Sequence, residues 1–322
     1  MLNAALIGAW HVHFGQHADE FASRNDCRIS ALWDDDPVRG KTCAAKYGCD
    51  FDPDYDAVLA RPDVDAVIVN SATNQHTELL LKAARAGKHI FTEKVLCLTV
   101  EDALALKQAV EQSGVKFCIA FFWRSHGDMQ TAKSLLEQGA LGEVTYARMR
   151  NPHDGAIAGW LPEHFYDPVQ CGGGAMIDLG THPMYLLAWL LGMPKAVSSV
   201  FTSVTGHAVE DNAVSVLEYE NGAIAVSETS FVACQGPASL EICGTKGSLC
   251  LGGAHGGLVV NTGEGWKAPE IPADQKIPMD FWVDGILTGS EIPYGIDDAV
   301  NLTLLMDAAY RSHREGKKAF LK

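Results

Sequence analysis

The fold is decided by the stretch Ala4-Ala5-Leu6-Ile7-Gly8-Ala9-Trp10-His11-Val12-His13, where a short apolar run ends at a glycine and passes into a polar turn. Four consecutive apolar residues are typical of a buried strand in a parallel sheet. In doubly wound folds, the turn after the first strand binds the pyrophosphate of a dinucleotide through free backbone amides and the helix dipole. The stretch therefore predicts a first strand and a candidate dinucleotide turn.

Strand-like and helix-like segments alternate through the first third of the chain. Further apolar runs lie at 28–33, 66–70, 89–92 and 116–120. Helical patterns lie between them at 38–47, 74–86 and 99–112. The first of these helices follows Asp36-Pro37 and stops at Gly48, and Thr99 is the expected N-cap of the third. This repeated order predicts a parallel sheet with helices on both faces.

The pattern changes after about residue 122. Strand-like segments follow one another at 144–150, 197–205, 213–220, 223–230, 239–243 and 248–251, and helices are expected at 178–191 and 297–315. Asn221-Gly222 predicts a hairpin turn, because both residues tolerate positive φ. We therefore expect a mainly antiparallel sheet here and two domains, 1–122 and 123–322, packed closely around the active site.

Composition narrows the class of protein. The chain has 322 residues, a formal net charge of −15 and 47% hydrophobic residues, so it fits two well-packed domains. An acidic surface repels phosphate backbones and anionic lipid, which argues against nucleic acid and membranes as partners. No signal peptide is visible, and the nine cysteines form no C-x-x-C pair. We expect reduced thiols in a cytoplasmic protein.

The candidate dinucleotide turn departs from the pattern G-x-G-x-x-G. Gly8 matches, whereas Trp10 and His13 stand at the second and third glycine positions. Asp34 ends the second strand, where a carboxylate usually accepts hydrogen bonds from the ribose hydroxyls. Asp35 and Asp36 follow it, and three carboxylates would repel a 2′-phosphate, which favours NAD over NADP. The alternative is that these aspartates only cap the next helix.

Three histidines, His11, His13 and His17, lie in or just after this turn. They are either loop residues without a ligand role, contacts of the cofactor (chiefly through Trp10 and His11), or ligands of a strand-end metal. No downstream carboxylate or histidine set has matching strand-end spacing. We therefore expect no metal.

Two further segments carry candidate chemistry. Lys94 follows the apolar run 89–92, at the carboxyl end of a strand, where open parallel sheets bind ligands. Asp178 and His182 are four residues apart, so on a helix they would share a face. The glycines at 172–174 predict a flexible approach to that helix. The alternatives are a solvated lysine, a capping aspartate and a histidine satisfied in the core.

Together these elements resemble the glucose–fructose oxidoreductase/inositol dehydrogenase (Gfo/Idh/MocA) family over nearly the whole chain. The similar segments are 71–76, 86–94, 178–182 and 241–249, although Ala72 and Val95 replace prolines. The resemblance implies an α/β protein, with an N-terminal Rossmann dinucleotide-binding domain and a C-terminal α/β domain with a large open, mainly antiparallel sheet. It implies a homodimer or homotetramer formed through that sheet, and catalytic roles for Lys94, Asp178 and His182.

The expected function is hydride transfer between nicotinamide and a hydroxyl carbon of a sugar, polyol or sugar-acid-like substrate. His182 would be the base, Lys94 would stabilise the alkoxide, and Asp178 would orient the centre. The expected cofactor contacts are Gly8, Trp10, His11, Val12, Asp34, Ser71, Thr73, His76 and Glu93. The expected substrate contacts are Trp123, Arg124, His153, Trp160 and His164.

Two other functions remain open at this point. One is a non-catalytic NAD- or sugar-binding protein of the same fold, which the altered glycine turn favours. The other is a metal-dependent hydrolase that uses His11 and His13.

Overall fold

The computed structural model describes residues 1–321 and divides into two compact units. Unit 1 comprises residues 1–120 and 276–300, and unit 2 comprises residues 121–275 and those from 301 onward. The segment 276–300, which the sequence placed in the second domain, thus belongs to the first. The reason is the helix α11 (Pro278–Thr288), whose fully buried Trp282 packs against the rings of Phe21 and Phe91.

Unit 1 is built on a six-stranded sheet in which all neighbouring strands are parallel, as the alternating pattern predicted. In spatial order, its strands are β3 (Asp50–Phe51), β2 (Cys27–Trp33), β1 (Leu2–Ile7), β4 (Ala66–Val69), β5 (His89–Thr92) and β6 (Phe117–Ile119). The order reverses between β1 and β4. Ligands of open α/β sheets bind at such a point, beside the carboxyl ends of the strands.

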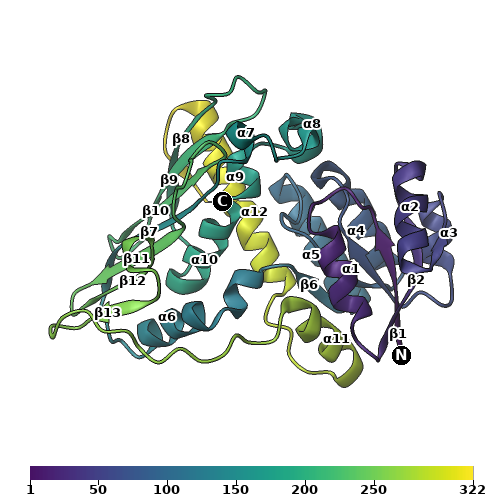
Figure 1. Ribbon diagram of the computed structural model, residues 1–322, viewed down its shortest axis with the longest axis horizontal. Helices are drawn as coiled ribbons and strands as arrows, with labels where there is room; N and C mark the ends of the chain where they lie inside the picture. The colour runs from purple at the N-terminus through teal and green to yellow at the C-terminus, as the bar shows by residue number, and fades with distance from the viewer. Residues whose placement is uncertain (322) are drawn as a thin grey trace. The chain divides into compact units, whose positions relative to one another are not determined.

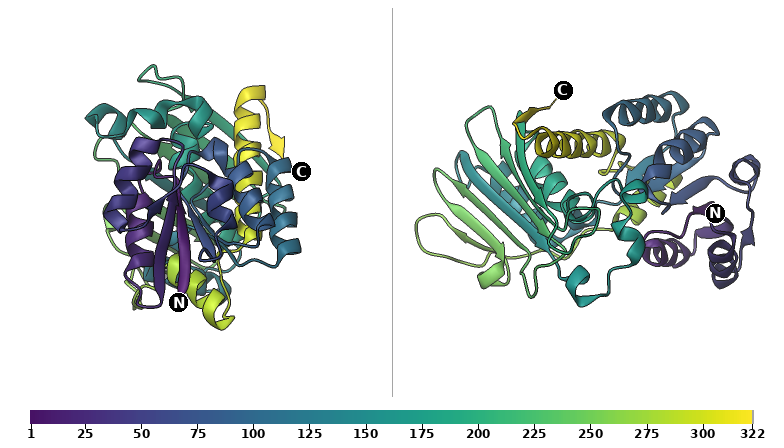
Figure 2. Two further views of the ribbon diagram at one scale, coloured as in Figure 1. Left: turned by 90° about the vertical axis from the view of Figure 1, so that its right-hand side faces the viewer. Right: turned by 90° about the horizontal axis from the view of Figure 1, so that it is seen from above.

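Helices cover both faces of this sheet (Figures 1 and 2). Besides α11, they are α1 (Phe14–Ala22), α2 (Pro37–Tyr47), α3 (Tyr55–Ala60), α4 (His76–Arg85), preceded by the 3-10 turn η1 (Thr73–Gln75), and α5 (Val100–Ser113). The predicted caps are confirmed: Thr99 accepts a hydrogen bond from the Asp102 amide, and Gly48 ends α2 with φ +64°. Local sequence signals thus determine where these helices begin and end.

Unit 2 is built on an eight-stranded sheet that is antiparallel except where β7 and β10 run parallel. In spatial order, its strands are β13 (Val259–Asn261), β12 (Ser248–Gly252), β11 (Ser239–Gly244), β7 (Val144–Pro152), β10 (Ile224–Ser230), β9 (Asn212–Glu218), β8 (Ala196–Thr202) and β14 (Ala319–Phe320). The predicted hairpin turn joins β9 to β10. The expected large, mainly antiparallel sheet is confirmed.

Helices gather on one face of the second sheet and leave the other face open (Figures 1 and 2). The helices are α6 (Gly127–Glu137), α7 (Gly155–Ala158), α8 (Pro168–Cys171), α9 (Ala175–Asp178), α10 (Thr181–Leu191) and α12 (Ile296–Glu315). Three 3-10 turns accompany them: η2 (Phe122–Ser125), η3 (Glu163–Tyr166) and η4 (Gly253–His255). The apolar α10 packs against β7 and β10 and forms much of the buried layer.

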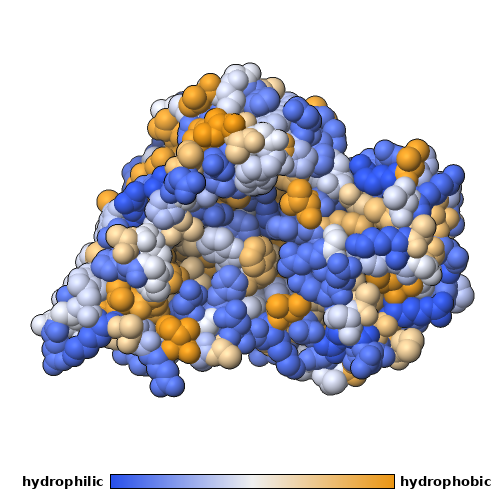
Figure 3. All heavy atoms as spheres, viewed as in Figure 1, coloured by the Kyte–Doolittle hydropathy of each residue, from blue (hydrophilic) through white to orange (hydrophobic). Residues whose placement is uncertain are grey.

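The surface agrees with an acidic, well-hydrated protein. On the face shown in Figure 3, hydrophilic residues predominate and hydrophobic ones form separate small groups. Within residues 1–321, none of the helices has both the length and the apolar character needed to cross a bilayer. All nine cysteines are free thiols, as expected.

Candidate functional site

The turn after β1 is fastened to the end of β4, at the point where the strand order reverses. Gly8 has φ +75°, and a Cβ there would lie 2.6 Å from the Cα of Ser71, so a larger residue does not fit. The amides of Trp10 and His11 both donate to the carbonyl of Asn70. Trp10, which stands at the second glycine position, is itself buried.

The rest of the turn is more accessible. Val12 is exposed and His13 lies just before the first residue of α1. The turn therefore keeps the position of a dinucleotide turn but presents a different surface, made by Val12 and His13 rather than by glycines.

Asp34 lies buried under the same turn. Its carboxylate accepts a hydrogen bond of 2.7 Å from the Ala9 amide and is held by the guanidinium of Arg39, which also pairs with Asp35. Asp36, rather than Asp34, caps α2. Arg39 lies in the first turn of α2, so two of the three carboxylates expected to repel a 2′-phosphate are paired with a cation. The end of β2 thus holds a cation as well as carboxylates.

A hollow of about 430 Å³ lies beside the end of β2. Trp33, Tyr55 and Leu79 supply apolar lining, while Asp35 and Gln75 supply polar groups. Gln75 donates to Asp35, and its side-chain oxygen is a buried acceptor without a partner among the described residues. The sequence did not identify this hollow, because its walls come from three separate segments, 33–35, 53–56 and 75–82. Thr73, one of the expected cofactor contacts, is the first residue of η1, two residues before Gln75.

His76 braces the segment that carries Lys94. The ring is buried, with Nδ1 2.7 Å from the carbonyl oxygen of Val95 and Nε2 3.3 Å from that of Ser71. Burial lowers the pKa of His76, and the nearby carbonyl groups act in the opposite direction. The Lys94–Val95 peptide bond is cis. His76 and Ser71 therefore lie behind the Lys94 segment, as its support.

The burial of His76 should make stability depend on pH. Because the pKa of His76 is lowered in the fold, the unfolded chain, with a histidine pKa of about 6.5, binds more protons in acid. The fold is therefore destabilised as the pH falls below about 6.5. We expect His76→Gln to lose less stability than the wild type between about pH 7 and pH 5. Denaturant unfolding at both pH values measures this, with exposed His255→Gln as the control; an unchanged slope for His76→Gln would contradict it.

Glu93 lies inside a group that we name the histidine–glutamate cluster: His11, His13, His17 and Glu93. Glu93 Oε1 is 2.7 Å from His13 Nδ1, 3.5 Å from His17 Nε2 and 3.6 Å from His11 Nδ1. Burial alone would raise the pKa of Glu93, but the surrounding histidines hold it well below its usual range. The sequence missed this grouping because it forms only when β1 and β5 flank β4.

Lys94 follows Glu93 directly at the carboxyl end of β5. Its amide donates to Glu93 Oε2 at 2.9 Å, and its side chain is largely buried. The lysine is therefore held by its own backbone to the histidine–glutamate cluster, and is not a solvated surface residue.

Asp178 and His182 do not share one continuous helix, which corrects the prediction. Asp178 ends α9, and α10 begins only at Thr181. The helix is interrupted because the amides of Leu179 and Gly180 both donate to the Ala175 carbonyl, which breaks the regular ladder. Asp178 and His182 thus lie on either side of a tight junction between two helices.

The sequence predicted that the glycines before α9 form a flexible approach. The structure shows instead that close packing requires glycine at these positions. A Cβ on Gly173 would lie 1.9 Å from the hydroxyl of Tyr310, and one on Gly174 would lie 2.1 Å from the carbonyl oxygen of Glu210. The Glu210 carboxylate accepts hydrogen bonds from the amides of Gly174 and Met176 and from Tyr310. Burial raises the pKa of Tyr310 well above its usual range. The segment leading to Asp178 is therefore fixed.

His182 is enclosed by aromatic rings. Its Nδ1 lies 3.1 Å from the hydroxyl of Tyr185, the indole of Trp123 stacks on it with centroids 5.1 Å apart, and Phe122 meets it edge-on. Tyr185, which the sequence analysis did not single out, is buried and stacks on Phe121. The ring of His182 is held in one orientation.

The predicted substrate residues differ in their exposure and in the rings that they contact. His153 contacts exposed Trp160 and stacks on Phe231; burial lowers the pKa of His153, while Asp178 acts in the opposite direction. Arg124 is instead buried, with its guanidinium over the ring of Trp189. His164 packs against Phe165.

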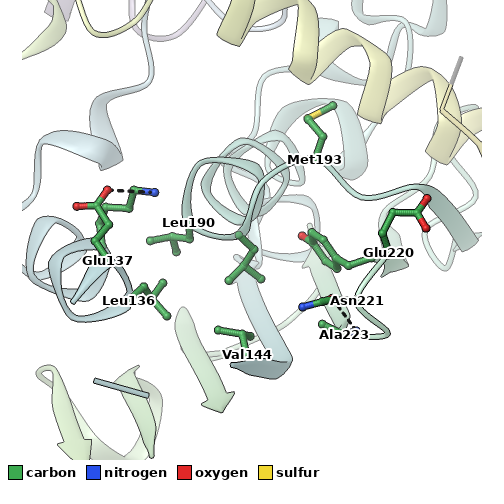
Figure 4. Close-up of a pocket in the computed structure, with 11 residues that line it drawn as sticks. Leu136, Glu137, Val144, Leu190, Met193, Glu220, Asn221 and Ala223 are labelled. Atoms are coloured by element: carbon green, nitrogen blue, oxygen red, sulfur yellow. Dashed lines mark hydrogen bonds and ion pairs between the residues drawn. The ribbon is translucent and has the colours of Figure 1, made fainter. Parts of the chain in front are cut away.

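Two hollows mark unit 2. One of about 270 Å³ is lined by Trp123, His126, Met129, Met149 and Leu240, among others. Trp123 thus borders this hollow and also stacks on His182. Another of about 480 Å³ lies between α6, α10 and the β9–β10 hairpin, with Glu137, Leu190 and Tyr219 in its wall (Figure 4). None of the predicted site residues lines this second hollow.

The parallel sheet with its turn at the reversal point is the arrangement of a dinucleotide-binding domain, and the chain adds to it a second domain with an open sheet. The chain belongs to the GFO/IDH/MocA family. Residues 2–121 match the oxidoreductase family with an NAD-binding Rossmann fold, and residues 129–250 match a GFO/IDH/MocA C-terminal domain.

Relatives of this chain extend over most of its length. Inositol 2-dehydrogenase of Rhizobium meliloti is 27% identical, with 97% of each chain covered. D-glucoside 3-dehydrogenase of Escherichia coli is 30% identical, with 79% of this chain and 78% of the relative covered. Among solved structures, GenD2 from gentamicin A biosynthesis, in complex with NAD, is 26% identical with a TM-score of 0.86, covering 100% of this chain and 96% of that one.

Proposed function

We propose that this protein is an NAD-dependent dehydrogenase acting on a hydroxyl-bearing carbon of a sugar, polyol or sugar acid. The observation that carries the proposal is that this member of the family has Lys94, Asp178 and His182, with the Lys94 amide bonded to Glu93 and the His182 ring held by Tyr185 and Trp123. The names of its relatives, an inositol and a glucoside dehydrogenase, support the substrate class.

In the oxidation direction, each residue has one task. His182 takes the proton from the reacting hydroxyl, because an imidazole titrates near neutral pH. Lys94 stabilises the developing alkoxide as a cation, and Asp178 accepts a hydrogen bond from a substrate hydroxyl. When bound, the cofactor accepts the hydride. The exposed indole of Trp160 offers a face on which a sugar ring stacks.

The hollow beside β2 suits the adenosine part of the cofactor. Trp33, Tyr55 and Leu79 would pack against a base, and the side-chain oxygen of Gln75, which has no partner among the described residues, would accept from the amino group of adenine. Asp35, whose side chain is 43% exposed, offers a carboxylate near the ribose, whereas the buried Asp34 carboxylate holds Arg39 and the Ala9 amide. The amides of Ala9, Trp10 and His11 already donate within the protein, so the phosphates would lie against the surface that Val12 and His13 form.

Cofactor preference tests the role of Asp34 and Arg39. We expect the wild type to bind NAD more tightly than NADP. In Arg39→Gln, NAD affinity should change less than tenfold, about 1.4 kcal/mol, whereas NADP should lose more because a 2′-phosphate needs this guanidinium. Calorimetric titration with both nucleotides measures this. Arg61→Gln, which removes ion pairs with Asp50 and Asp63, is the matched control; a wild type that prefers NADP would contradict the proposal.

The function itself is tested by mixing the protein and NAD with a panel of polyols, sugars and sugar acids and following the absorbance of the reduced cofactor. Turnover of at least one member is the expected result. Tight NAD binding without turnover of any member would instead favour a non-catalytic binding protein.

We also expect a homodimer or homotetramer, working in the cytoplasm and formed through the open face of the second sheet. Tyr146, Val200, Val214 and Ile224 all project from that face and are exposed. Light scattering should report more than one chain per particle, and Val200→Glu with Val214→Glu should shift it to monomers. A wild-type monomer at all concentrations would contradict this.

A further inference from the structure

We propose that the histidine–glutamate cluster binds a divalent transition-metal ion, with His11, His13 and Glu93 as ligands and His17 as the neighbouring fourth donor. Binding of this ion would be a property beyond the proposed dehydrogenase function, because every donor lies in unit 1 and none of them is Lys94, Asp178 or His182. Zn²⁺ is the ion whose chemistry fits best.

The distances suit one ion. The donor atoms of His11, His13 and Glu93 all lie within 4.8 Å of one another. In a tetrahedral site with bonds of about 2.0–2.1 Å, neighbouring donors are roughly 3.4 Å apart. The separations from Glu93 Oε1 to His11 Nδ1 and His17 Nε2, 3.6 and 3.5 Å, are close to that value. His13, now 2.7 Å from the same oxygen, needs only a small side-chain rotation.

The hydrogen bonds around the cluster indicate which ring nitrogens carry lone pairs. His17 Nδ1 lies 2.9 Å from the side-chain oxygen of Asn70, so Nδ1 donates and the lone pair of Nε2 faces Glu93. His11 Nδ1 accepts a 3.2 Å bond from the His13 amide, so it is the unprotonated nitrogen of this ring, and an ion bound there would take the place of that hydrogen bond. A cation bound between these nitrogens and Glu93 would offset the cost of burying the carboxylate.

The hydrogen bonds that hold these donor side chains are of the kind found at metal sites. A metal-bound histidine usually donates its other ring N–H to an oxygen, as His17 does to Asn70. A ligating carboxylate is usually held by a hydrogen bond, as Glu93 is by the Lys94 amide. Asn70 is itself fully buried, and its side-chain nitrogen has no hydrogen-bond partner within residues 1–321. The donors are therefore pre-oriented, and His13, with 27% of its side chain exposed, leaves a way in.

The donor types select the class of ion. Imidazole nitrogens with one carboxylate suit Zn²⁺, whereas Mg²⁺ and Ca²⁺ prefer oxygen ligands alone. The expectation of no metal rested on the lack of a carboxylate with matching spacing. Glu93 is that carboxylate, 80 residues from His13 in the chain. The ion would join the turn after β1 to β5, where His13 replaces a glycine.

The test uses the full chain, stripped with a chelator and titrated with Zn²⁺ by calorimetry, and with Co²⁺ by visible absorption. We expect one ion per chain and a Co²⁺ spectrum without thiolate charge-transfer bands, which excludes the nine cysteines as ligands. His13→Gln and Glu93→Gln should each weaken binding by at least about 10–100-fold. His255→Gln and Glu78→Gln, both at exposed positions, should bind as the wild type does.

Folding of each variant is checked by circular dichroism. Because Glu93 is buried, its variant can fail to fold, and the decision then rests on His13→Gln, whose side chain is partly exposed. The absence of saturable binding by the wild type, a thiolate-type Co²⁺ spectrum, or unchanged affinity in folded His13→Gln would each overturn the proposal. No substrate or NAD is present, so these outcomes are independent of the dehydrogenase assay.

Discussion

Replacing His182 or Lys94 by alanine should lower kcat by about 10²–10⁴-fold and leave NAD affinity largely unchanged. His182→Ala removes the proposed base, and Lys94→Ala removes the cation beside the developing alkoxide. Both groups act on the reacting hydroxyl, so their loss should appear in kcat as well as in kcat/KM. Steady-state kinetics on the best substrate of the panel, together with calorimetric NAD titration, measure the two quantities separately.

The controls carry the same residue types at exposed positions. Lys41→Ala on α2 and His255→Ala in η4 should retain wild-type kinetics. Since His182 stacks on Trp123, thermal unfolding of His182→Ala must be compared with the wild type. Full activity in both Lys94→Ala and His182→Ala would show that the assignment of roles is wrong.

Gly174→Ala should destabilise unit 2 by about 1–3 kcal/mol and also reduce kcat/KM. The added Cβ would lie 2.1 Å from the Glu210 carbonyl oxygen, a backbone atom that cannot move aside as a side chain can. Relief requires a shift of the segment that leads into α9, and α9 ends at Asp178. The measurement is thermal unfolding combined with steady-state kinetics.

Gly257→Ala is the matched control, because a Cβ at that position meets no atom within 4 Å. It should change neither stability nor activity. If Gly174→Ala unfolded like the wild type, the glycines at 172–174 would be flexible after all, as the sequence first indicated.

Short-range patterns account for what was predicted well. Apolar runs of four to six residues and helix caps such as Thr99 are local, so the order of strands and helices followed from them. The same holds for the Asn221-Gly222 hairpin turn. The junction between α9 and α10 was missed, because it depends on two amides sharing the Ala175 carbonyl, which no spacing rule reveals.

By itself, the sequence determined the two kinds of sheet, the turn after β1 and the candidates Lys94, Asp178 and His182, because each depends on neighbours in the chain. Only the tertiary structure decided what surrounds them. Arg39 neutralises Asp34, Glu210 holds Gly174, and Glu93 joins histidines some 80 residues away. Such contacts form when parallel strands bring their carboxyl ends together, and distance in the chain does not encode them.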